Sequence, residues 1–173
     1  MTGSTTPLYL MAGISLLLAA AIFGFFYAWV CSTMWGLDAA DPQVAVAAMQ
    51  AMNASVRNAV FAPAFFGTPV ALAITALLAA AAREPRSAIA FGAAALVYGF
   101  GAFAVTLAIN VPMNEALAAA GTPASTEDAQ RLWLDYSPPW QFWNTMRTIA
   151  SAVAVLLTGY AIAQLGPRLA VAA

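Results

Sequence analysis

The chain has 173 residues, of which 63% are hydrophobic and only 8% are charged. A soluble domain carries about a quarter charged residues and cannot bury so much apolar surface at this length, so the composition predicts a membrane protein. The net charge of −1, without lysine or histidine, excludes a basic nucleic-acid-binding surface and histidine-ligated haem or metal sites. The single cysteine, Cys31, excludes an intramolecular disulfide, and we expect its thiol to be buried and inert.

Four uncharged stretches are each long enough to cross a bilayer, which takes about 20 helical residues. In chain order they cover residues 8–30, 60–82, 88–110 and 148–165. The first stretch lacks a basic leading segment and is too long for a signal peptide, so we expect it to remain as a membrane helix. The sequence therefore predicts a single transmembrane domain, residues 1–173, of the all-α class: a four-helix bundle.

The connections between the spans differ in kind. Residues 83–87 form a short turn, which makes the second and third spans an antiparallel hairpin. The first connection is long, and Asp41-Pro42 in it is a favourable helix start. We expect this helix to continue through Arg57 and to merge into the second span near Pro63. The connection is thus predicted to be structured.

The third connection is also predicted to be structured. It opens at Asn110-Val-Pro-Met-Asn114, where Pro112 removes a helical hydrogen bond from the carbonyl of Ala108. A short helix is expected to start near Ser125, since two acids follow in its first turn. Ser137-Pro138-Pro139 then predicts the start of the last helix, well before its apolar part.

The arginines divide equally between the two sides of the predicted bundle. One side holds Arg83, Arg86 and Arg168, and the other holds Arg57, Arg131 and Arg147. Since Arg57 and Arg147 lie close to the spans and have an expected structural role, we assign the first side to the cytoplasm. Both termini are then cytoplasmic, and the two long connections are extracytoplasmic.

Polar and aromatic residues gather at the predicted outer end, on three separate segments. They are Asn53 and Arg57, then Asn110, Asn114 and Glu115, and finally Trp140, Trp143, Asn144 and Arg147. Four-helix topology brings all three segments to the same membrane surface. Two interpretations stay open: an aromatic belt with interhelical hydrogen bonds, or the lining of a pocket.

Four motifs resemble the anthrone oxygenase-like family of four-span membrane proteins, which is largely bacterial and of unknown function. They are Met49-Gln-Ala-Met-Asn53, Arg57-Asn58-Ala-Val-Phe61, Asn110-Val-Pro-Met-Asn114 and Trp140-Gln-Phe-Trp143-Asn144-Thr-Met-Arg147. The resemblance covers nearly the whole chain and implies a bacterial inner-membrane location. A few fungal relatives oxidise anthrones to anthraquinones without a metal or an organic cofactor. Relatives with oxygenase activity tend to carry histidine near Asn144, and asparagine cannot replace histidine as a base.

The resemblance implies a protein that binds a hydrophobic or quinone-like molecule at its outer end and oxidises it without a cofactor. The catalytic candidates are Arg147, Asn144 and Glu115. The substrate-binding candidates are Asn110, Asn114, Trp140, Trp143, Arg57 and Asn53. We expect no metal site. The alternative is a non-catalytic structural or accessory subunit of a membrane complex, in which Arg57, Arg147 and Glu115 form closed ion pairs.

The expected partners are the lipid bilayer and an aromatic or quinone-like small molecule, and nucleic acid is not among them. Assembly into a homo-oligomer or into a membrane complex stays open. Four spans without an inverted repeat argue against a transporter.

Overall fold

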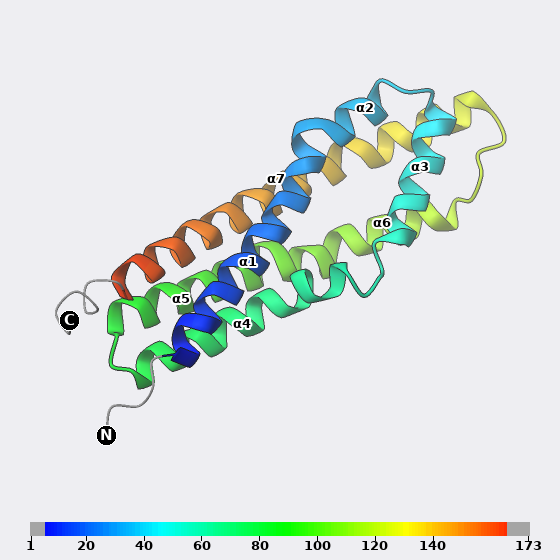
Figure 1. The fold of residues 1–173 in the computed structure, drawn as a ribbon. Coiled ribbons are helices and arrows are strands. Elements are labelled where there is room, and N and C mark those ends of the chain that lie inside the picture. The colour runs from blue at the N-terminus through cyan, green and yellow to red at the C-terminus, as the bar shows by residue number, and fades with distance from the viewer. Residues whose placement is uncertain (1–5, 166–173) are drawn as a thin grey trace.

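The computed structural model describes residues 6–165, in which all regular structure is helical (Figure 1). Arg168, used above to orient the chain, lies outside these residues. In chain order the elements are α1 (Thr6–Ala28), the π-helix η1 (Trp29–Thr33), α2 (Met34–Asp38), α3 (Pro42–Ser55), α4 (Phe61–Ala81), α5 (Pro85–Tyr98), the π-helices η2 (Gly99–Ala104) and η3 (Thr106–Asn110), α6 (Val111–Ala119) and α7 (Thr126–Leu165).

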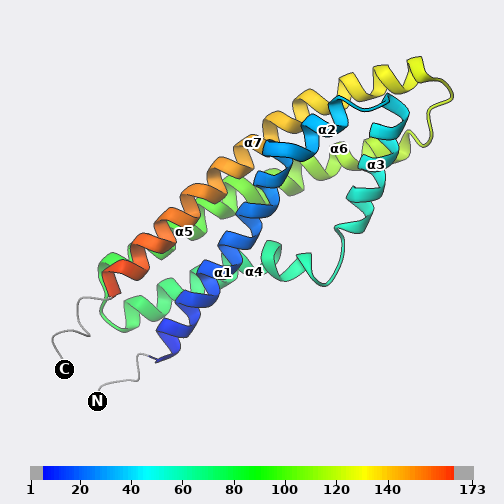
Figure 2. The same cartoon turned by 45° about the horizontal axis from the view of Figure 1, so that its top comes forward.

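Consecutive elements join into four long helices, which run side by side in both views (Figures 1 and 2). Each of the four, Thr6–Asp38, Phe61–Ala81, Pro85–Ala119 and Thr126–Leu165, is long and apolar enough to cross a membrane. The prediction of an all-α, four-span membrane bundle with two structured connections is confirmed. We call the end with the short α4–α5 turn the turn end, and the end with α2, α3 and α6 the loop end.

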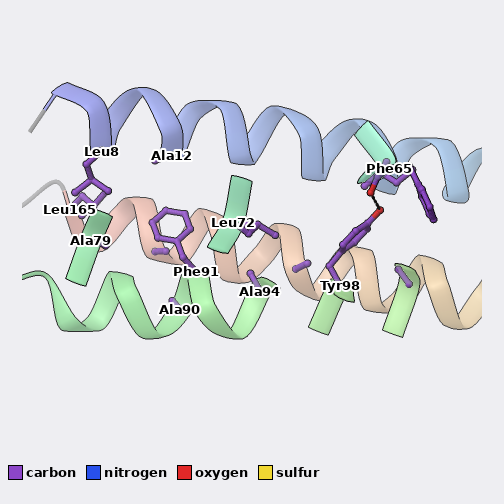
Figure 3. Close-up of a cluster of buried hydrophobic side chains, with 14 of the residues drawn as sticks. Leu8, Ala12, Phe65, Leu72, Ala79, Ala90, Phe91, Ala94, Tyr98 and Leu165 are labelled. Carbon is purple, nitrogen blue, oxygen red and sulfur yellow. Dashed lines mark hydrogen bonds between the residues drawn. The ribbon is translucent and has the colours of Figure 1, made fainter. Parts of the chain in front are cut away.

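The core between the spans is built from small residues and a few large rings. Phe91, Leu72 and Tyr98 are fully buried there, among alanines that let the helices approach closely (Figure 3). The Tyr98 hydroxyl donates a hydrogen bond to the carbonyl oxygen of Phe65 at 3.0 Å and so ties α5 to α4. These contacts hold the spans at fixed distances up to the level of Phe65.

A second core lies at the loop end and packs α2, α3 and α6 against α7. Its buried members are Met34, Ala45, Val46, Met49, Leu117, Trp133, Tyr136 and Trp140. The Asp38 carboxylate fixes the same packing, because it accepts hydrogen bonds from Trp133 Nε1 (2.9 Å), Ser137 Oγ (2.7 Å) and Gln141 Nε2 (2.8 Å). The long connections are therefore folded onto the bundle.

The last helix does not start at Ser137-Pro138-Pro139, as the sequence had suggested. Instead α7 runs unbroken through both prolines from Thr126. The carbonyl groups that lose their helical donors belong to Leu134 and Asp135, both of which are exposed. The three bonds to Asp38 come from positions 133, 137 and 141, so tertiary contacts hold the helix on both sides of the prolines.

The helix begun at Asp41-Pro42 does not merge into the second span near Pro63. It ends at Ser55, and α4 begins at Phe61. Asn58 separates them, because its Oδ1 accepts hydrogen bonds from the backbone N–H groups of Val60 (2.8 Å) and Phe61 (3.0 Å). Arg57 consequently lies in the α3–α4 connection rather than on one helix face with Asn53.

The chain stays helical at Asn110-Val-Pro-Met-Asn114, where we had expected the third span to end and the connection to begin. The π-helix η3 leads directly into α6, where Pro112 occupies the first turn. A wider π turn accommodates the missing hydrogen bond before a proline. Cys31 is exposed, so the expectation of a buried thiol was wrong; an evenly apolar helix gives no sign of which face packs.

Candidate functional site

The four long helices reach one level of the bilayer at the loop end. Helix α4 has 21 residues and rises about 31 Å, which matches a hydrocarbon core of about 30 Å. The other three long helices reach the same height above the turn end within one turn of three residues. These are Phe26 on α1, Thr106 on η3 and Arg147 on α7. The residues around this level therefore lie at the boundary between hydrocarbon and headgroups.

A cavity of about 600 Å³ lies at this boundary. Its apolar wall is mostly aromatic and consists of Phe25, Phe26, Trp29, Phe61, Phe65, Phe66 and Trp140, with Met52 and several smaller residues. Its polar members are Asn53, Arg57, Asn58, Thr106, Asn114, Glu115 and Arg147. An apolar cavity of this size with a few converging polar groups is typical of a small-molecule site.

Arg147 is the buried cation of the cavity, with 4% of its surface exposed. Its Nη1 donates to Thr106 Oγ1 at 3.1 Å and its Nη2 donates to Asn144 Oδ1 at 2.9 Å. The guanidinium carbon lies 4.7 Å from the ring centre of Phe26 and 5.3 Å from that of Trp140. Two aromatic faces and two neutral oxygens thus surround the charge.

No acid neutralises Arg147 among residues 6–165. The two ion pairs in that range join Arg57 to Glu115 and Arg131 to Asp128. Arginine stays protonated in proteins, and a buried charge without a counter-ion is strongly unfavourable. Its Nε is also buried without a hydrogen-bond partner. Arg147 lines the cavity, so its uncompensated charge is available to bind an anionic oxygen.

Asn144 does not line the cavity, but it accepts a hydrogen bond from Arg147 and so holds that side chain in place. It is buried, and its Nδ2 donates to the carbonyl oxygen of Phe26 at 3.1 Å while its Oδ1 holds the guanidinium. Asn110 is also buried outside the lining; its Nδ2 reaches the carbonyl oxygen of Trp140 at 3.5 Å. Trp143 packs edge-on against Phe142 and does not reach the cavity.

Asn114 and Asn53 hold the aromatic wall in place. Asn114 Oδ1 accepts hydrogen bonds from the Tyr136 hydroxyl (2.7 Å) and from Trp140 Nε1 (2.8 Å). Asn53 Nδ2 donates to the same Tyr136 hydroxyl at 3.4 Å. The Trp140 ring lies 5.2 Å from Trp29. This network holds the Tyr136 and Trp140 rings in place.

Arg57 and Glu115 meet at the rim of the cavity. Arg57 Nη2 lies 3.4 Å from Glu115 Oε1, and both side chains are about three-fifths exposed, at 62% and 60%. An exposed pair of this kind contributes little to stability. It does, however, join the α3–α4 connection to α6 directly over the cavity.

The structure thus places six of the nine predicted site residues on the cavity and three outside it. Five residues of the site and its surroundings were not among the predicted ones: Phe26, Phe61, Phe65, Thr106 and Tyr136. Thr106 had a weak signal, because it precedes Asn110 by four residues on an otherwise apolar span. The phenylalanines had none, because hydropathy does not distinguish an apolar side chain that faces lipid from one that lines a cavity.

No metal cluster is present in the described part of the chain, where no three histidine, cysteine, aspartate or glutamate side chains come together. What the site offers chemically is an aromatic enclosure, a buried guanidinium and one carboxylate at the rim. This combination suits a flat hydrophobic molecule that carries, or develops, negative charge on an oxygen.

A comparison with protein families identifies the chain. The family model described as anthrone oxygenase matches residues 57–157, which is more than half of the sequence. The match begins at Arg57 and includes Thr106, Glu115 and Arg147. Comparisons with curated proteins and with solved structures gave no match. The chain belongs to the anthrone oxygenase family.

Proposed function

We propose that this protein binds a flat, quinone-like or phenolic molecule in the loop-end cavity and oxidises an anthrone there without a cofactor. The observation that carries the proposal is the buried Arg147, which faces an aromatic cavity without an acid to neutralise it. The family membership supports the same reaction class. The walls formed by Trp29, Trp140 and Phe65 suit stacking against a fused ring system.

The reaction converts a methylene group into a carbonyl. Loss of a methylene proton from an anthrone gives an aromatic enolate, whose charge rests on the oxygen opposite. Arg147 stabilises that oxygen through its positive charge and the guanidinium N–H groups that its bonds to Thr106 and Asn144 leave free. The enolate carbon then bonds to O₂, and the resulting peroxide loses water. Anthrone and O₂ thus give anthraquinone and water, with O₂ accepting four electrons.

Proton removal needs a base, and the cavity offers one carboxylate for it, that of Glu115. Asn144 has no basic group, so in this proposal it is a positioning residue that holds the guanidinium together with Thr106. Asn114 and Asn53 position the tryptophan and tyrosine rings. Asn110 and Trp143 have no contact with the substrate.

The setting of the reaction belongs to the same proposal. The protein lies in a bacterial inner membrane with both termini in the cytoplasm, so the cavity opens at the extracytoplasmic surface. Arginine placement supports this orientation.

Aerobic conversion of emodin anthrone by purified protein tests the proposal directly. The expected result is a rate well above the uncatalysed background, and a large loss in Arg147→Gln. Arg131→Gln is the matched control, because Arg131 lies on the same helix, is exposed and pairs with Asp128. No rate above background in the wild-type protein would contradict the oxygenase function and favour the accessory-subunit alternative. Ligand binding is measured separately, by quenching of tryptophan fluorescence.

A further inference from the structure

We infer that the ligand reaches the cavity from within the bilayer, through a gap between the first turns of α4 and the η3–α6 segment. This inference rests on the proposed binding function and adds to it the source of the substrate. It makes the protein an enzyme for molecules dissolved in the membrane rather than in water. Three features of the cavity rim carry the argument.

The first feature is the inner limit of the gap. Phe66 on α4 meets Phe103 on η2 edge-to-face, with ring centres 5.7 Å apart, and Phe65 stacks on Phe103 at 5.0 Å. These rings close the space between the two helices towards the turn end. One turn further out, the cavity is lined by Ala62 on α4 and by Leu107 and Val111 opposite. The gap therefore begins directly beyond the phenylalanine contact.

The second feature is the outer limit of the gap. Arg57, in the connection that leads into α4, lies 3.4 Å from Glu115 on α6. The α3–α4 connection bows away from the bundle before α4 begins (Figure 2), and Asn58 fixes that bend through its bonds to Val60 and Phe61. A charged pair therefore crosses the side that faces water, whereas an apolar opening remains below it.

The third feature is the depth of the opening. Ala62 is the second residue of α4, and Leu107 lies about 20 residues from the start of α5. Both therefore lie near the outer limit of the hydrocarbon region, about 30 Å from the turn end. The side chains at the edge are apolar and exposed: Phe66 is 53% and Leu107 46% exposed. Such a surface is stable against lipid and unfavourable against water.

The depth also matches the expected ligand. A flat hydrophobic molecule with a phenolic oxygen lies in a bilayer with its rings in the hydrocarbon and its oxygen at the headgroup boundary. Arg147 lies at that boundary, about 27 Å along α7 from Leu165. The molecule can move sideways through the gap and meet the guanidinium without leaving its preferred depth.

Stopped-flow fluorescence on protein in phospholipid vesicles tests this route, with 1,8-dihydroxyanthraquinone as the probe. Trp29 and Trp140 line the cavity and report its occupancy. Ala62→Phe narrows the gap, and we expect about tenfold slower association and dissociation, with the Kd changed by less than about threefold. Leu107→Ala widens the gap at an exposed position and is expected to accelerate both rates.

Two substitutions outside the cavity lining serve as controls. Val60→Phe alters the exposed α3–α4 connection, and Ala73→Phe alters an exposed position on α4 away from the cavity. Both should keep wild-type rates. Slow exchange in Val60→Phe with normal exchange in Ala62→Phe and Leu107→Ala would overturn the membrane route but leave the binding function intact. Wild-type rates in all four variants would also overturn it. No quenching in the wild-type protein would contradict the binding function itself.

Discussion

Arg147 and Asn144 lie one turn apart on α7, and the amide oxygen of Asn144 accepts a 2.9 Å hydrogen bond from the Arg147 guanidinium. Asn144 in turn donates to the carbonyl oxygen of Phe26. A neutral amide thus orients the cation between two helices without neutralising it. The charge therefore stays available to a ligand that enters the cavity.

Replacing Arg147 by methionine separates a structural role from a functional one. Exchange of an uncompensated buried charge for an apolar side chain of similar length is often neutral or stabilising, by up to about 3 kcal/mol. We therefore expect Arg147→Met to keep or raise the thermal unfolding midpoint in detergent while binding of 1,8-dihydroxyanthraquinone is lost. A strongly lowered midpoint would instead assign Arg147 to the architecture of the bundle.

Substitution of Asn144 by aspartate tests the importance of the unneutralised charge. The new carboxylate would lie at hydrogen-bond distance from Arg147 and form an ion pair with it. Because this pair competes with an anionic ligand, affinity for the hydroxyanthraquinone should fall about tenfold, or 1.4 kcal/mol. Titration of tryptophan quenching in vesicles measures the change. Unchanged affinity would show that the ligand does not use the guanidinium charge.

Glu115→Gln separates base catalysis from binding. The Glu115 carboxylate is 60% exposed and pairs with Arg57, so its loss should change the unfolding midpoint little. If Glu115 removes the anthrone proton, the oxidation rate falls about a hundredfold while the Kd of the quinone product is kept. Arg57→Gln is the matched variant, since it breaks the same ion pair but keeps the carboxylate. Equal losses in the two variants would point to the ion pair rather than to the base.

Gly101 lies at a close approach between η2 and α7. A Cβ atom added there would lie 2.6 Å from Ala150 Cβ, a separation that requires the helices to move apart. Gly101→Ala should therefore destabilise by about 1–3 kcal/mol. Gly92→Ala is the matched control, because a Cβ there meets nothing within 4 Å. The double variant Gly101→Ala/Ala150→Gly should recover most of the loss, as measured by thermal unfolding.

The three hydrogen bonds to Asp38 fasten α2 to α7 at the loop end. Asp38→Ala leaves three donors without this acceptor, and a loss of about 1–3 kcal/mol is expected. Hydrogen exchange should rise in α2 and α3 but not in α4 and α5, whose core is separate. Asp135→Ala is the control, because Asp135 is exposed on α7. It should change neither the stability nor the hydrogen exchange.

Hydropathy and composition are enough to establish the class of the protein. At this length and composition, four long uncharged stretches permit only membrane helices. Consecutive spans cross the bilayer in opposite directions, so the three polar segments had to meet at one end of the bundle. Motifs such as Asn110-Val-Pro-Met-Asn114 and Trp140 to Arg147 were sufficient to suggest the family. These conclusions depend on hydropathy and on chain order, which are local properties.

Which side chains form the cavity depends on how the helices pack. Whether Asn114 or Asn110 faces it depends on the helix phase after two π-helices, and η2 and η3 have no recognisable signature in the sequence. Likewise, α7 continues through Pro138-Pro139 because Asp38, about a hundred residues earlier, holds both sides of the break. The pairing of Arg57 with Glu115, and the isolation of Arg147, depend on how far apart folding places the acids and the arginines. Distances of this kind arise from packing between helices, so no local pattern in the chain predicts them.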